Sequence, residues 1–200
     1  FTPLHTALRS RASDAARLLI DRGAQVHTQS HDGETPLHVA SEFGDTEIVG
    51  LLVRRGAEVG AATQTGDTPL LRAARQGHHD IAQYLIAEGA DVDAWGMTLA
   101  PGGEEFQNPL HAAIECDHRH LVQLLLDSGA DVDAKDRLDR SPAVRAMQKN
   151  QKRVVAALAA GRLISAQQGA PEGVQGDAEM GVGVVKTGEQ VSHRHFETHF

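Results

Sequence analysis

The sequence predicts an all-α repeat solenoid of about five helix-turn-helix units, and two regular spacings carry this prediction. A proline recurs at steps of 33, 33, 40 and 33 residues, at Pro3, Pro36, Pro69, Pro109 and Pro142. A Gly-Ala pair recurs in the same register, beginning at Gly23, Gly56, Gly89 and Gly129. A fixed period near 33 residues is typical of arrays in which each unit packs only on its neighbours.

Residues 35–67 show the expected unit most clearly. Thr35 is suited to cap a first helix, and Pro36 suits its first position, where a missing N–H costs nothing. Gly44 favours a turn, because glycine tolerates positive φ. An apolar stripe at helical spacing then predicts a second helix and includes Ile48, Val49, Leu51 and Leu52. Residues 57–66 should form an extended, β-hairpin-like finger that leads into the next unit.

The predicted repeat domain covers residues 1–164. Its units are 2–34, 35–67, 68–107, 108–140 and 141–162, and residues 165–200 form a glycine-rich segment that we expect to be a flexible, disordered tail. Arg11, Asp117 and Asn150 replace the turn glycine in the first, fourth and fifth units. In a turn of unchanged shape, Arg11 would carry roughly 1 to 2 kcal/mol of left-handed strain. We also expect Leu51 and Leu124 to be core residues.

Three motifs in the same register identify the family that these units resemble. Thr-Pro-Leu-His at residues 35–38 is followed by Gly-x-x-x-Ile-Val-x-Leu-Leu at residues 44–52, and Gly-Ala-Asp-Val closes later units at residues 89–92 and 129–132. Together they resemble the ankyrin repeat, and the resemblance covers roughly residues 1–162. In that family the motif histidine usually hydrogen-bonds locally and to the adjacent unit. Leu71 replaces it in the third unit and Val144 in the fifth, so we expect the junction after the third unit to depend more on apolar packing.

The resemblance implies a non-enzymatic protein–protein interaction module or scaffold. Partners of such arrays meet the concave helix face, at the end of each inner helix, and the tips of the fingers. The candidate protein-binding residues carried over by motif position, or placed in the long finger described next, are Glu42, Phe43, Arg75, Gln76, Trp95, Phe106, Lys135, Arg137 and Arg140. For Phe43, the only apolar aromatic among the helix positions, the alternative is packing in the core.

The finger between the third and fourth units is seven residues longer than the others and contains the only tryptophan, Trp95. Insertions in repeat arrays fall in loops, often on the binding face, and tryptophan is a frequent hot-spot residue. These properties indicate a binding role for residues 94–107. The alternative is that Trp95 and Phe106 fold back over the neighbouring finger.

Charge argues against nucleic acid as a partner. The net charge is −8 with a pI near 5.8, which is unfavourable for binding a phosphate backbone. Residues 135–162 form an exception, with eight basic and two acidic side chains. This stretch is either a surface for an anionic partner or a solvated polar face of the last unit.

Neither a catalytic site nor a cofactor or metal site is expected. The sequence has no nucleophile elbow, P-loop or zinc-protease motif, so we expect no small-molecule substrate. His5, His38 and His111 belong to the repeat motif. The remaining histidine groups lack cysteine or carboxylate partners at ligand spacing, and they include His78-His79, His118 with His120, and His193, His195 and His199.

Cysteine usage and hydropathy bound the compartment. The single cysteine, Cys116, excludes an internal disulfide and indicates a reducing compartment, so we expect an intracellular protein in the cytoplasm or the nucleus. No apolar run approaches the ~18 to 20 residues that a membrane span needs. We further expect a monomer.

An alternative function follows from the first residue, Phe1, which lies directly before the first Thr-Pro-Leu-His motif and indicates a fragment. On this hypothesis the array is the non-catalytic, substrate- or partner-binding arm of a larger enzyme, channel or degradation adaptor.

Overall fold

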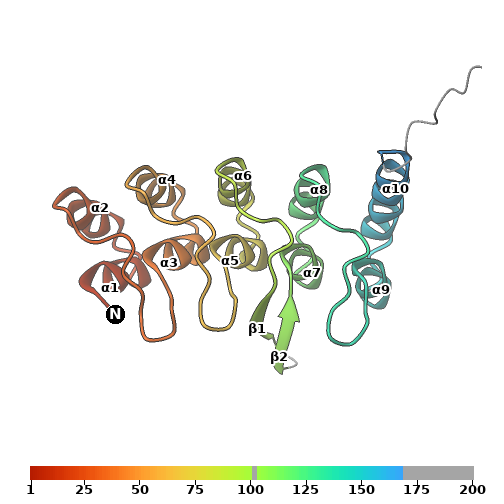
Figure 1. Ribbon diagram of the computed structural model, residues 1–200, viewed down its shortest axis with the longest axis horizontal. Coiled ribbons are helices and arrows are strands. Elements are labelled where there is room, and N and C mark those ends of the chain that lie inside the picture. Colours follow the sequence, from red (N-terminus) through yellow and green to blue (C-terminus); the bar gives the residue numbers. More distant parts are fainter. Residues whose placement is uncertain (101–102, 169–200) are drawn as a thin grey trace, which may run out of the picture. The chain divides into compact units, whose positions relative to one another are not determined.

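The computed structural model describes residues 1–100 and 103–168. Within these ranges the chain forms ten helices and a single two-stranded sheet, which confirms the predicted all-α repeat solenoid. The helices stand in five pairs side by side, and a finger connects each pair to the next (Figure 1). Contacts link each inner helix to the following inner helix, as expected for units that pack only on neighbours.

Each pair has an inner helix next to the fingers and an outer helix behind it. The pairs are α1 (Pro3–Arg9) with α2 (Ser13–Asp21), α3 (Pro36–Phe43) with α4 (Thr46–Arg54), α5 (Pro69–Gln76) with α6 (His79–Ala87), α7 (Pro109–Glu115) with α8 (Arg119–Asp127), and α9 (Pro142–Gln148) with α10 (Lys152–Gln168). Every inner helix begins with its proline, directly after an extended capping residue. The Thr68 hydroxyl, for example, accepts from the Leu71 N–H at 3.2 Å.

The turns between paired helices have the left-handed conformation that the sequence predicts. Gly44 has a φ of 83° and Gly77 a φ of 76°. Arg11, Asp117 and Asn150 take φ values of 52°, 59° and 56° at the same position, so Arg11 does carry the expected strain. A second reason requires glycine at Gly44, since a methyl group there would lie 2.5 Å from the ring of His78 in the next unit.

Two ladders of side-chain hydrogen bonds join successive units. In the first, the motif histidines His5 and His38 each donate from Nε2, at 3.0 Å, to the backbone carbonyl of the last residue of their unit, directly before the capping threonine of the next unit. In the second, His78 and His118 donate from Nε2, also at 3.0 Å, to carbonyls near the end of the inner helix of the preceding unit. The acceptors are Glu42 on α3 and Arg75 on α5. Gln151 takes the same place in the last unit, with its Nε2 2.9 Å from the Ile114 carbonyl.

The core lies between the helix pairs and contains mostly leucine, isoleucine, valine and alanine. Leu52 and Leu125 are fully buried. The sequence had placed Leu51 and Leu124 in this core, but both are only half-buried at its edge. Successive helical residues point about 100° apart, so the next residue along takes the interior position.

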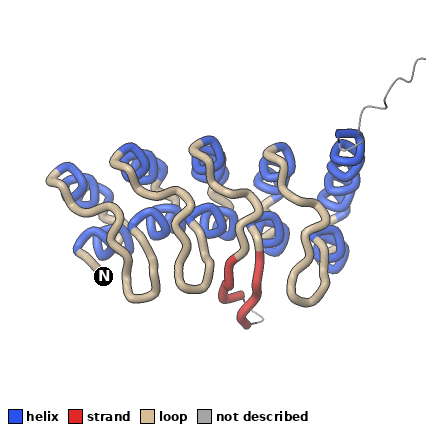
Figure 2. Tube along the Cα trace, viewed as in Figure 1, coloured by secondary structure: helices blue, strands red, loops and turns tan. Residues whose placement is uncertain are grey.

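The long finger is the only one that forms regular strands in the described part of the chain (Figure 2). β1 (Gly96–Ala100) pairs antiparallel with β2 (Gly103–Gln107), and Met97 lies opposite Phe106. The Met97 N–H donates to the Thr65 carbonyl of the preceding finger at 2.8 Å, which fixes the hairpin to the array.

The C-terminal helix α10 runs past residue 164 to Gln168. Most of the predicted tail, residues 169–200, lies outside the described residues, and so do the histidines from His193 onward. None of the described helices is long and apolar enough to cross a membrane.

Candidate functional site

A buried arginine links three carboxylates at the base of the first fingers. Arg72, on α5, forms ion pairs with Glu34, Glu42 and Asp67, and its side chain is only 15% exposed. Its Nε lies 2.8 Å from Asp67 and its Nη1 lies 2.7 Å from Glu42. Arg9 also pairs with Glu34, and Arg75 also pairs with Asp67. We call these six residues the Arg72 cluster.

A second cluster of the same design lies two units further along. Arg145, on α9, pairs with Glu105, Asp136 and Glu115 at 2.9, 2.8 and 3.4 Å. Its side chain is 2% exposed. Arg140 also pairs with Asp136 and Glu105, and Lys149 pairs with Glu115. We call these six residues the Arg145 cluster. Glu42 and Glu115, six residues after the proline of their units, have the same role in the two clusters.

Arginines favour the charged form of one carboxylate in each cluster, Glu34 and Asp136. Burial raises the pKa of Glu34, but hydrogen bonds and charge from Arg9 and Arg72 outweigh it, so the net pKa is below the ordinary value. Burial likewise opposes ionisation of Asp136, whose pKa is lowered overall by bonds from Arg140 and Arg145. Glu34 and Asp136 therefore act as fixed acceptors and are poor proton donors near neutral pH.

Two adjoining grooves contain most of the residues that the sequence singled out. The larger, of about 620 Å³, is lined by the Arg72 cluster together with Gln76, Asp32, Thr63, Gln64, Thr65 and Met97. The smaller, of about 250 Å³, is lined by Phe106, Arg137, Arg140, Arg145, Glu105, Asp136, Leu138 and Met97. Met97 lines both, so the hairpin separates two grooves on one continuous surface. We call this surface the finger face. Of the predicted residues it brings together Glu42, Arg75, Gln76, Phe106, Arg137 and Arg140.

The aromatic residues of the insertion form an ordered stack. Trp95 stacks on Phe106 with ring centroids 5.3 Å apart and an angle of 13° between the planes. The Arg137 guanidinium lies over Phe106, 4.5 Å from the ring centroid, and Trp95 also contacts the His111 ring at 5.3 Å. Trp95 therefore packs within the array at the junction that lacks a motif histidine, while Phe106 and Arg137 line the smaller groove.

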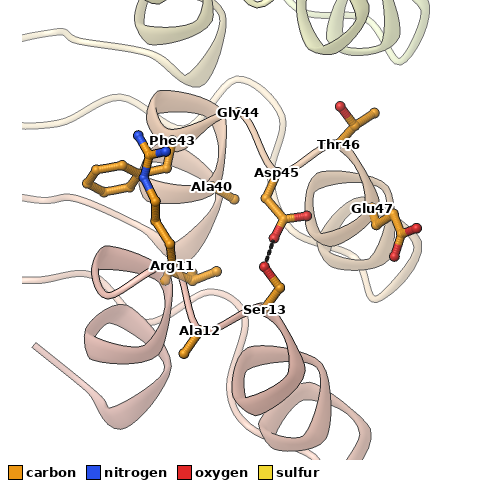
Figure 3. Close-up of a pocket in the computed structure, with 10 residues that line it drawn as sticks. Arg11, Ala12, Ser13, Ala40, Phe43, Gly44, Asp45, Thr46 and Glu47 are labelled. Atoms are coloured by element: carbon orange, nitrogen blue, oxygen red, sulfur yellow. Dashed lines mark hydrogen bonds between the residues drawn. The ribbon is translucent and has the colours of Figure 1, made fainter.

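Phe43 and Lys135 lie apart from the other candidates. Phe43 is half-buried against the core and lines a separate cavity of about 410 Å³ between the first two units. Figure 3 shows the Arg11 guanidinium beside its ring, 5.3 Å from the centroid. Lys135 is exposed and pairs with Asp139 at 2.8 Å. Neither lines the two grooves of the finger face.

The basic stretch from residue 135 is largely neutralised where it meets the finger face. Arg140, Arg145 and Lys149 are paired with carboxylates, including Glu105 and Glu115 from outside the stretch. Arg137 differs, because it has no ion pair within the described residues and contacts the Phe106 ring instead.

Within the described ranges, the thiol and the histidines form neither an activated nucleophile nor a metal-binding group. Cys116 is exposed at the end of α7, and partial burial together with Glu115 raises the pKa of its thiol, which disfavours the nucleophilic thiolate. In the described ranges, no three His, Cys, Asp or Glu side chains group as they would around a metal ion. His78 and His118 instead hold adjacent units together.

The sequence did not single out the two central arginines, although it contains a signal for them. Arg72 and Arg145 each stand three residues after the unit's proline, directly after Leu71 and Val144. These are the two units in which the motif histidine is missing. A long cationic side chain next to each substitution, with acidic residues in the adjacent finger, indicates an ion-pair cluster in place of the histidine bond.

Comparison with protein families and with curated proteins gave two matches and one negative result. A model of three ankyrin repeats matches residues 4–96, and a model of a single ankyrin repeat matches residues 106–137. Together these matches span more than half of the chain. The comparison with curated proteins found no match.

Proposed function

The chain belongs to the ankyrin-repeat family, whose members are generally protein–protein interaction modules, and we propose that it binds a protein partner through the finger face without catalysing a reaction. The observation that carries the proposal is the pair of grooves that adjoin at Met97. Side chains from five successive units line them, so the surface exists only in the stacked array.

The composition of the finger face supports recognition of a protein. Its grooves combine arginines, a methionine and an aromatic ring, which are the residue types enriched in protein interfaces and their hot spots. Most of its charged side chains are held by buried ion pairs within the two clusters. Such a surface loses little side-chain entropy on binding, because its rotamers are already fixed.

The protonation states on the finger face support a non-enzymatic role. Its buried carboxylates Glu34 and Asp136 have lowered pKa values, whereas a general acid or base working near pH 7 needs a raised one. Each carboxylate is also already bound to two arginines. These groups are suited to hold a surface in shape.

Affinity capture with matched variants tests the proposal. The double variant Gln76→Glu, Arg137→Glu alters two exposed residues of the finger face. Its control, Gln123→Glu, Arg153→Glu, makes the same chemical changes at exposed positions on the outer helices α8 and α10. A partner retained by wild type and the control but lost by the first variant would support the proposal. Equal retention by both variants, with unchanged circular dichroism, would contradict it.

The hypothesis that the array is the partner-binding arm of a larger enzyme, channel or degradation adaptor stays a prediction. It assigns the same role to the finger face and differs only in what else the full-length protein contains. Sequencing the full transcript tests it, and a transcript that adds only further repeats would contradict it.

A further inference from the structure

Among the described residues, the smaller groove of the finger face contains one cation without an ion pair. Arg137 is exposed and has no ion pair within the described residues. Its two acidic neighbours along the chain are already engaged, because Asp136 binds Arg140 and Arg145 while Asp139 binds Lys135. The guanidinium of Arg137 therefore presents its N–H groups to solvent.

The Phe106 ring contacts this guanidinium. The Arg137 Cζ lies over the ring, 4.5 Å from its centroid, a cation–π contact that leaves guanidinium N–H groups for a second partner. Phe106 is itself stacked on Trp95, with ring centroids 5.3 Å apart. A planar, preorganised guanidinium matches the two oxygens of a carboxylate and loses little entropy when it binds one.

Apolar surface adjoins the cation within the same groove. Leu138, the next residue, is 68% exposed, although it is a large aliphatic side chain. Met97 and Phe106 line the groove beside it, and the groove has a volume of about 250 Å³. Met97, Phe106 and Leu138 therefore form an apolar part of a groove whose other lining residues are charged. The lining has three arginines against two carboxylates, an excess of positive charge in a chain of net charge −8.

We propose that this groove binds a segment of a protein partner in which a bulky apolar side chain lies next to a carboxylate. The apolar side chain enters the groove between Met97, Phe106 and Leu138, and the carboxylate binds the edge of the Arg137 guanidinium. The inference rests on the proposed function and assigns a chemistry to the partner. The larger groove does not supply this chemistry, because each arginine of the Arg72 cluster is already paired.

A phage-displayed library of random peptides, panned on the whole chain, tests the inference. Enriched peptides should share a Leu, Ile, Phe or Trp flanked by Asp or Glu. Titration of a synthetic enriched peptide should change the fluorescence of Trp95, the only tryptophan, because Trp95 stacks on the ring that Arg137 covers. Arg137→Glu should weaken binding at least tenfold, and Arg137→Lys should weaken it less, because lysine keeps the charge but not the planar, two-pronged guanidinium.

The control Arg153→Glu makes the same charge change on α10 and should leave the affinity within about twofold of wild type. Enriched peptides that lack the acidic-apolar pattern, or that bind Arg137→Glu as well as wild type, would overturn the inference. Gln76 lines the larger groove. If peptides without the pattern were enriched and Gln76→Glu abolished their binding, the inference about the smaller groove would fail, but the proposed function of the finger face would stand. Failure of a folded chain to enrich any peptide would overturn the inference and would also count against the proposed function.

Discussion

Replacing Arg72 by alanine should lower the free energy of unfolding of the array. The loss should be larger than for an alanine substitution at any other exposed or half-buried charged residue in the first three units. The substitution takes the central cation from Glu34, Glu42 and Asp67. Glu34 and Asp67 are 5% and 6% exposed, so water cannot replace the lost partner. Arg9 and Arg75 still bind one oxygen of each, which limits the damage.

The magnitude follows from this geometry. Removing one partner of a buried ion pair costs about 3 to 5 kcal/mol, because it leaves an uncompensated charge in the interior. The remaining arginines and the partial exposure of Glu42 place Arg72→Ala at the lower end, near 3 kcal/mol. The pKa of Glu34, lowered in the native array, should rise in the variant. A lowered carboxyl pKa stabilises the fold above its unfolded pKa, so the variant should lose part of its stability advantage at pH 7 over pH 4.

Urea denaturation followed by circular dichroism measures the free energy of unfolding. Arg17→Ala is the matched control, because Arg17 pairs with Glu47 on the surface, where both side chains are more than half exposed. That control should cost less than about 1 kcal/mol. In a Glu34→Gln background, Arg72→Ala should cost less than it does alone, since one of the buried charges is already gone. A loss below about 1 kcal/mol for Arg72→Ala would refute the assignment of Arg72 as the buried centre of the cluster.

Three further predictions concern the packing and the histidine ladder. Leu52→Ala should cost roughly 2 to 5 kcal/mol, and more than Leu51→Ala, by urea denaturation; the opposite order would contradict the assigned core. Gly44→Ala should lower the free energy of unfolding by at least about 1 kcal/mol more than Gly89→Ala. Both glycines have positive φ, but only a methyl group at position 44 would meet a histidine ring. Equal melting temperatures of the two variants would refute this. Burial lowers the pKa of His38, so the unfolded chain binds a proton more readily and stability should fall as the pH drops from about 7 to 5. His38→Leu should reduce that slope, and an unchanged slope would mean that His38 is not buried in its neutral form.

The period of the sequence predicted the fold because each landmark has a local physical cause. A capping residue followed by proline begins every inner helix, and a residue with positive φ ends it. The left-handed turn at Arg11 could be predicted for the same reason, since the turn keeps its shape even where glycine is absent. These features depend on a few neighbouring residues, so the sequence shows them directly.

The finger face could be predicted only in part. Glu42, Arg75 and Gln76, which were selected by motif position, line one groove, because equivalent residues of stacked units line up. The two central arginines, Arg72 and Arg145, were missed because each binds side chains from several units at once. The repeat pattern of a single unit does not contain that information.

The insertion illustrates the same limit. The sequence left open whether Trp95 and Phe106 bind a partner or fold back onto the array. The structure divides the pair, since Trp95 packs against His111 and Phe106 while Phe106 also lines the smaller groove. The direction in which the Phe106 ring points depends on the register of β1 with β2, which hydrophobicity alone does not determine.

Site-specific photo-crosslinking shows directly whether the finger face binds a protein partner. A photoreactive amino acid replaces Gln76 on the finger face in one sample and Gln123 on the outer helix α8 in another, both at exposed positions. After irradiation in native lysate, mass spectrometry identifies what is attached. We expect a protein that is crosslinked to the residue at position 76 and is not crosslinked to the residue at position 123. The same protein crosslinked from position 123 alone, or equally from both, would contradict it.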